Sequence, residues 1–200
     1  RKRMNVLFGT LLLTGSLFSQ NVCVSTPETS LVLSAPVGGE LKHVYYGDKL
    51  SEVDLQNINL TGTPDMPAYP VYGLNCPGES ALAVKHADGN MTLDMNVAGV
   101  TTKKEDNGAE VTTITMTDKV YPFTIDVNYR TYPGEDVIET WVEATHNEKG
   151  VVNLSRFMSG YLPIRRSDVH VSQLYGSWAN EGKVEEAPLP HNLKVIKNKD

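Results

Sequence analysis

Over most of its length the chain alternates apolar and polar residues, in short runs that turn residues separate. The alternation is cleanest at residues 91–97, 111–117, 123–129 and 137–144. A period of two places every second side chain on one face of a strand, whereas a helix needs a period of about 3.6. The pattern therefore predicts half-buried β-strands. Weaker runs that predict strands are 41–46, 81–85, 154–164 and 169–175, and only 50–60 favours a short helix.

Turn residues stand between these runs. Asp88-Gly89 and Asn107-Gly108 are strong hairpin signals, and each is expected to join the strands beside it. Many short strands at roughly 8–12-residue spacing are typical of an all-β fold. We therefore expect a β-sandwich of antiparallel sheets, without an internal repeat or a second-domain boundary. Residues 61–78 contain four prolines and predict a long, stiff loop.

The first twenty residues differ from the rest. Arg1-Lys2-Arg3 precedes an uncharged apolar stretch of 13 residues, Val6–Phe18, and polar residues follow. This is the layout of a secretory signal peptide, and it is shorter than the roughly 20 residues that cross a bilayer. We expect residues 1–20 to be a signal peptide and the protein to be periplasmic or extracellular, with no membrane span. A buried first strand or helix is the alternative.

Charge narrows the class of partner. The 200 residues carry 18 Lys and Arg against 24 Asp and Glu, a net charge of −6. Removal of residues 1–20 leaves 15 basic residues against 24 acidic ones, a net charge of −9. There is no basic stripe, so an ordinary nucleic-acid binder is excluded. The length favours one domain with its own core.

The two cysteines, Cys23 and Cys76, leave three interpretations open. Export permits a disulfide between them, although two cysteines do not make a disulfide scaffold. Cys23 could instead be the lipidated residue of a lipoprotein, but Gln20 and Val22 are poor residues for the small positions that such a site requires. Both thiols could also be free.

Motifs for metal, nucleotide or nucleophilic chemistry are missing from the sequence. The five histidines have no HxxxH or HxH spacing, and no GxSxG, Walker or GxGxxG motif is present. We therefore expect no metal and no cofactor. Carboxylates at alternating positions are typical of a solvated strand face, and the chain has many: Asp94, Asp126, Asp136, Glu139, Glu143, Glu181, Glu185 and Glu186.

Aromatic side chains are better candidates for a binding surface, because a flat ring can stack on the face of a sugar. Trp141 lies in the middle of a predicted strand, which favours core packing. Trp178 lies between Gly176-Ser177 and Ala179–Gly182, a loop context in which binding residues concentrate. For Trp178 a core position and a binding site are equally open.

Several short motifs follow one another along residues 30–200: His43–Leu50 (HVYYGDKL), Ala68–Gly73 (AYPVYG), Ser80–Leu82, His86–Gly89 (HADG), Asp136–Ile138, Asn147, Ser159-Gly160 and Gly176–Glu181 (GSWANE). Their order and spacing together resemble the N-terminal region of family 36 glycoside hydrolases, the melibiase-type α-galactosidases. Each motif alone is weak, and the resemblance depends on their being collinear.

The sequence departs from that family's pattern in places. Ala68 stands where the family has an acid, and Glu139-Thr140 replaces an arginine-containing pair. Residues 74–79 lack the family's GDxR motif and contain Cys76. Sugar contacts that the family makes from these loops do not carry over to this chain.

The resemblance implies a β-supersandwich, like that of galactose mutarotase, packed against a (β/α)8 barrel of the same parent chain. In the family the barrel carries both catalytic aspartates, one of them in a Lys-Trp-Asp motif. Neither tryptophan here precedes Asp, since the dipeptides are Trp141-Val142 and Trp178-Ala179. The resemblance therefore implies no catalytic residue in this chain, and a β domain that is incomplete at its C-terminal end.

The functional prediction is the N-terminal non-catalytic β domain, residues 21–200, of an exported α-galactosidase that hydrolyses terminal α-galactosides in oligosaccharides. The domain would help to shape the sugar pocket and subunit contacts, with Trp178, Glu181 and Tyr72 as the substrate-binding candidates. A homo-oligomer is possible. The alternatives are a free-standing carbohydrate-binding or adhesive β-sandwich module and a structural outer-surface domain.

Overall fold

The structure is a computed structural model that describes residues 21–58, 66–73, 78–164 and 168–189. The described chain is nearly all β, with 54% of residues in strands and 4% in helix. Its contacts divide it into two compact units, residues 1–163 and 164–200. Each unit is described by itself below. The predicted signal peptide, residues 1–20, lies outside the described residues.

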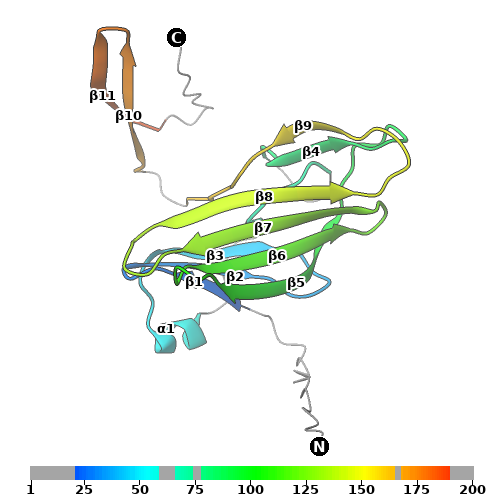
Figure 1. The fold of residues 1–200 in the computed structure, drawn as a ribbon, viewed down its shortest axis with the longest axis horizontal. Coiled ribbons are helices and arrows are strands. Elements are labelled where there is room, and N and C mark those ends of the chain that lie inside the picture. The colour runs from blue at the N-terminus through cyan, green and yellow to red at the C-terminus, as the bar shows by residue number, and fades with distance from the viewer. Residues whose placement is uncertain (1–20, 59–65, 74–77, 165–167, 190–200) are drawn as a thin grey trace, which may run out of the picture. The chain divides into compact units, whose positions relative to one another are not determined.

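A four-stranded antiparallel meander forms one layer of the first unit (Figure 1). Its strands are β5 (Met95–Lys104), β6 (Glu110–Asp118), β7 (Phe123–Thr131) and β8 (Ile138–His146). Asn107-Gly108 forms the predicted hairpin turn between β5 and β6, and Gly108 has a φ of 84°, which a residue without Cβ adopts at little cost. The runs 111–117 and 123–129 lie wholly within β6 and β7, and the run 137–144 lies in β8 from Ile138 onward, so these three are confirmed as strands.

A three-stranded antiparallel sheet forms the second layer, with strands β1 (Asn21–Ser25), β2 (Thr29–Ser34) and β3 (Lys42–Asp48). Alternate residues of the two sheets face each other across a shared core. Leu33 of β2 and Ile114, Ile125 and Val127 of the meander are almost wholly buried in it. The predicted all-β sandwich with antiparallel sheets is thus confirmed.

A short helix, α1 (Glu52–Asn57), follows β3 and falls within the predicted range 50–60. Ser51 caps it, because the Ser51 hydroxyl accepts from the Asp54 amide while the Asp54 carboxylate accepts from the Ser51 amide. The helix buries no residue, so it contributes little to the core.

The two-stranded sheet of β4 (Leu82–Lys85) and β9 (Asn153–Phe157) corrects one prediction. Asp88-Gly89 does form a turn, and Gly89 has a φ of 92°. The turn does not join a hairpin, however, because β4 pairs with β9 rather than with β5. Turn residues specify a reversal of the chain, whereas the partner of a strand depends on the more distant sequence.

Two strand boundaries also differ from the prediction. Residues 91–94 precede β5 rather than belonging to it, and there the Asp94 amide donates to the Asp118 carboxylate at 2.7 Å. The run 154–164 forms a strand only as far as Phe157, since Tyr69 binds the Met158 carbonyl and Thr140 binds the Ser159 carbonyl. Side chains thus take up backbone groups there that a longer strand would have paired.

The second unit is an antiparallel hairpin of β10 (His170–Ser177) and β11 (Asn180–Pro188). The alternating run 169–175 predicts the first strand. The second strand was missed, because Asn180-Glu181-Gly182 has the composition of a loop. Among the described residues, no helix is both long and apolar enough to cross a membrane.

Candidate functional site

Trp178 occupies the two-residue turn at the tip of the β10–β11 hairpin, between the paired residues Ser177 and Asn180. Its side chain is 94% exposed, so Trp178 does not pack in a core within its own unit. The next residue, Ala179, has a φ of 61°, although this left-handed conformation is unfavourable for a residue with a Cβ. The hairpin turn thus combines an exposed Trp178 side chain with an unfavourable backbone conformation at Ala179.

The other two substrate-binding candidates are placed differently. Glu181 lies in β11, and its side chain falls outside the described part of the structure. Tyr72 lies in the first unit, where the amide of Tyr72 donates to the Leu82 carbonyl at 2.8 Å and its carbonyl accepts from the Leu93 amide at 3.0 Å. Its ring is 49% exposed. Tyr72 and Trp178 therefore belong to different units, and the structure describes each within its own.

The backbone around Tyr72 is tightly held. Gly73 has a φ of 137°, and a Cβ at this position would lie 2.8 Å from both the amide nitrogen and the carbonyl oxygen of Leu93. Only glycine allows so close an approach of two backbone segments. Tyr72 is consequently an exposed ring on a rigid support, as a binding residue requires.

Trp141 lies on the outer face of the meander, so the prediction of core packing is wrong. Its neighbour Val142 is buried in the core, and successive strand residues point to opposite faces. The indole Nε1 donates to Glu143 at 2.9 Å, and the Arg130 guanidinium lies 4.8 Å from the centre of the ring. The Trp141 ring therefore packs against side chains on the outer surface of the meander.

The carboxylates at alternating positions have structural partners. Asp136 accepts from the hydroxyls of Thr26 and Thr29, and these hydrogen bonds lower the pKa of its carboxyl. The other described carboxylates and their partners are Asp94 with Lys119, Asp126 with Thr115, Glu139 with Arg130 and Tyr132, Glu185 with Gln173, and Glu186 with Ser172. Among the described residues, no group of three or more His, Cys, Asp or Glu side chains is arranged to hold a metal ion.

The thiol of Cys23 is exposed, lies 3.1 Å from the Ser25 hydroxyl, and forms no disulfide with another described residue. Cys76, its possible disulfide partner, lies outside the described residues. The choice among the three cysteine interpretations therefore stays a prediction.

The sequence did not reveal a buried polar cluster around His86. The His86 ring stacks on Tyr121 with 3.6 Å between centroids, and its Nδ1 lies 2.7 Å from the Glu148 carboxylate. Burial tends to raise the pKa of Glu148, but the hydrogen bonds from His86 and from the Ala87 amide outweigh it, so the pKa is lowered. The His86 Nε2 is buried and has no hydrogen-bond partner among the described residues, and the whole side chain is inaccessible to solvent.

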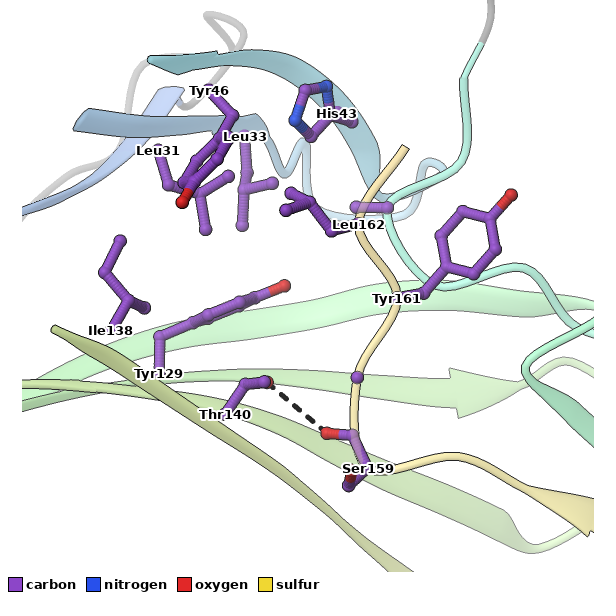
Figure 2. A pocket seen from close by; sticks show the side chains of 12 residues that line it. Leu31, Leu33, His43, Tyr46, Tyr129, Ile138, Thr140, Ser159, Tyr161 and Leu162 are labelled. Carbon is purple, nitrogen blue, oxygen red and sulfur yellow. Dashed lines mark hydrogen bonds between the residues drawn. The ribbon is translucent and has the colours of Figure 1, made fainter. Parts of the chain in front are cut away.

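A cavity of about 350 Å³ lies between the two layers of the first unit and was also missed (Figure 2). Leu31 and Leu33 approach it from β2, and Tyr129 and Ile138 approach it from β7 and β8. Segment 159–162 forms one side. Its lining residues come from six separate segments, and periodicity within any one segment cannot bring them together.

Comparison with known proteins gives two results. The family model of the glycosyl hydrolase family 36 N-terminal domain matches residues 39–200. No curated protein matches the sequence.

Solved structures share the fold. The α-galactosidase of Lactobacillus brevis superposes with a TM-score of 0.73 at 20% identity, over 86% of this chain and 28% of its own. Variants of the α-galactosidase AgaA from Geobacillus stearothermophilus, in complex with raffinose or stachyose, superpose with a TM-score of 0.75 at 19% identity and the same coverage. The chain thus spans a little over a quarter of the length of these proteins.

Proposed function

Because the chain belongs to the glycosyl hydrolase family 36 N-terminal domains, we propose that it is the non-catalytic β domain of an exported α-galactosidase. The parent enzyme would hydrolyse terminal α-galactosides in oligosaccharides, with two carboxylates on a (β/α)8 barrel of the same chain. The family match over residues 39–200 is the observation that supports this proposal.

In this proposal Trp178, Tyr72 and Glu181 contact the sugar, and other surfaces of the domain contribute to subunit contacts. The support for Trp178 is its combination of exposure and backbone strain. Strained non-glycine residues persist where the surrounding structure or a function requires them, and an exposed indole suits the apolar face of a pyranose. Tyr72 adds a second exposed ring on a rigid backbone.

The experiment is a kinetic comparison in the parent enzyme, with raffinose as substrate. Trp178→Ala should raise KM about tenfold. This corresponds to about 1.4 kcal/mol, which lies within the roughly 1–3 kcal/mol that an aromatic side chain contributes by stacking on a nucleic-acid base. Trp178→Phe should recover part of the loss. Leu174→Ala is the matched control, because Leu174 is an exposed apolar residue of the same hairpin. Equal, small effects of all three substitutions would contradict a sugar contact at Trp178.

A free-standing carbohydrate-binding module is the second candidate, favoured by the full exposure of Trp178 on this chain alone. Titration of the purified chain with raffinose, followed by tryptophan fluorescence, separates the two functions. If Trp178 needs the barrel to complete its pocket, the titration is flat. Saturable quenching that Trp178→Phe abolishes would favour the module.

The proposal includes export. Cleavage after a signal peptide at residues 1–20 predicts a secreted chain whose intact mass lacks these residues. Mass spectrometry of the mature protein tests this directly, and a diacylglyceryl mass on Cys23 would indicate the lipoprotein instead. A mature protein that keeps residues 1–20 would contradict both.

A further inference from the structure

The lining of the cavity between the layers contains no carboxylate, ammonium or guanidinium group. Its twelve lining residues include no Asp, Glu, Lys or Arg. Aliphatic side chains form much of it: Leu31, Leu33, Ala68, Ile138 and Leu162. A charged ligand would lose its hydration there without gaining a partner of opposite charge. The buried part of the lining consists of Leu31, Leu33, Ala68 and Tyr129, so it offers one side-chain hydroxyl group to the several that a galactoside presents. This part of the cavity therefore suits an apolar ligand better than the galactoside of the proposed function.

Six of the lining residues carry polar side-chain atoms, and Tyr129 is the one of these six that is buried. The Tyr129 side chain is 6% exposed and points into the cavity from β7 (Figure 2). No residue of the described chain hydrogen-bonds its hydroxyl, whereas the neighbouring Tyr69 hydroxyl donates to the Met158 carbonyl at 2.6 Å. Burial raises the pKa of Tyr129, so the phenol is neutral and can both donate and accept. A buried hydroxyl without a partner is costly unless a ligand or water supplies one.

The walls of the cavity favour a small molecule over an added β-strand. Segment 159–162 lies beside β8, where the Thr140 hydroxyl donates to the Ser159 carbonyl and Gly160 packs against Thr140. At the start of β3, the His43 amide donates to the Met66 carbonyl. The backbone edges nearest the cavity are thus already occupied in part.

The volume sets the size of the occupant. An apolar protein cavity of about 150 Å³ is enough to bind benzene. A cavity of about 350 Å³ therefore accommodates a substituted ring. Aromatic side chains at the cavity, Tyr46, Tyr129 and Tyr161, can contact such a ring at its edge or face.

We propose that this cavity is a binding site for a small, neutral ring compound with one hydroxyl group, which hydrogen-bonds the Tyr129 hydroxyl while its ring contacts Leu31, Leu33 and Ile138. Tyr72, Trp178 and Glu181 are not among the lining residues of this cavity. This binding site goes beyond the proposed function, because its ligand is a largely apolar ring compound rather than a sugar.

The test measures binding of p-cresol and toluene to the purified 200-residue chain. The two probes differ by one hydroxyl group. Two-dimensional NMR should show saturable shifts at amides of the lining residues with both probes, with p-cresol binding more tightly. Tyr129→Phe should weaken p-cresol binding about fivefold, which corresponds to one ordinary hydrogen bond, and leave toluene binding unchanged. Tyr129→Phe removes only the hydroxyl without a partner, so it should fold normally.

A second pair of variants tests the location. Ile138→Trp should fill the cavity and abolish binding of both probes, whereas Val137→Trp adds the same bulk at an exposed neighbour and should leave binding intact. The proposal is overturned if p-cresol fails to bind or if Ile138→Trp leaves binding unchanged. It is also overturned if a structure of a longer parent chain shows the cavity filled by a side chain of that protein.

Discussion

The imidazole Nδ1 of His86 lies 2.7 Å from the carboxylate of Glu148, and both side chains are almost fully buried. His86 follows β4, and Glu148 belongs to the turn between β8 and β9. The His86 ring also stacks on Tyr121, in the turn before β7. One buried pair thus fixes three turns of the first unit to one another.

Removal of the Glu148 carboxylate should destabilise the fold. Glu148→Ala leaves the His86 Nδ1 and the Ala87 amide without acceptors, and each buried unpaired group costs free energy. We expect the free energy of unfolding to fall by about 2–3 kcal/mol in urea denaturation. Glu135→Ala is the control, because Glu135 is exposed in a turn and should change stability by less than about 0.5 kcal/mol. Equal effects of the two substitutions would show that the pair does not stabilise the fold.

The lowered pKa of Glu148 makes part of this stability depend on pH. A carboxyl whose pKa is lower in the folded than in the unfolded protein contributes stability above its unfolded pKa, near 4.5, and loses it as pH falls through the folded value. The stability difference between the wild type and Glu148→Gln should therefore be largest near neutral pH and shrink below about pH 4.5. Urea denaturation across a pH series measures it, and a difference that stays constant down to pH 3 would refute the linkage.

Two buried tyrosines should respond differently to loss of the hydroxyl. Tyr69→Phe removes a hydrogen bond to the Met158 carbonyl and should cost about 1 kcal/mol. Tyr129→Phe removes a hydroxyl that has no partner among the described residues, and should leave the free energy of unfolding unchanged or raise it by up to about 1 kcal/mol. Thermal denaturation of the two variants gives the comparison directly. A larger loss for Tyr129→Phe than for Tyr69→Phe would mean that the Tyr129 hydroxyl has a structural partner.

The β10–β11 hairpin has two residues with positive φ, and their substitutions should act in opposite directions. Ala179, in the turn, has a φ of 61°, and Gly182, in β11, has a φ of 76°. Ala179→Gly relieves the left-handed strain, and should slow hydrogen exchange of the β10–β11 amides by a factor that corresponds to at most about 1 kcal/mol. Gly182→Ala introduces the same strain into open space and should speed exchange. If both variants shift exchange in the same direction, backbone strain does not control this hairpin.

The sequence predicted the meander β5–β8 well, because alternation marks strands and Asn107-Gly108 marks a hairpin turn. It could not predict that β4 pairs with β9, since that pairing joins residues about 70 apart along the chain. Alternation also leaves open which face of a strand is buried, and Trp141 was assigned to the wrong face for that reason. Tyr72 and Trp178 are exposed, and their contact with substrate stays a prediction. The cavity at Tyr129 depends on contacts between layers that no local pattern encodes.

The last prediction concerns activity. Neither tryptophan of the sequence precedes an aspartate. The described carboxylates at alternating strand positions, among them Asp126 and Glu139, engage structural partners. Retaining hydrolysis needs two carboxyl groups about 5–5.5 Å apart on either side of the glycosidic bond. We therefore expect the purified chain to release no aryl group from an aryl α-galactoside, while a parent enzyme that contains the barrel does so. Release by the purified chain, at a rate that scales with its concentration and persists through a second purification step, would place the chemistry within these residues.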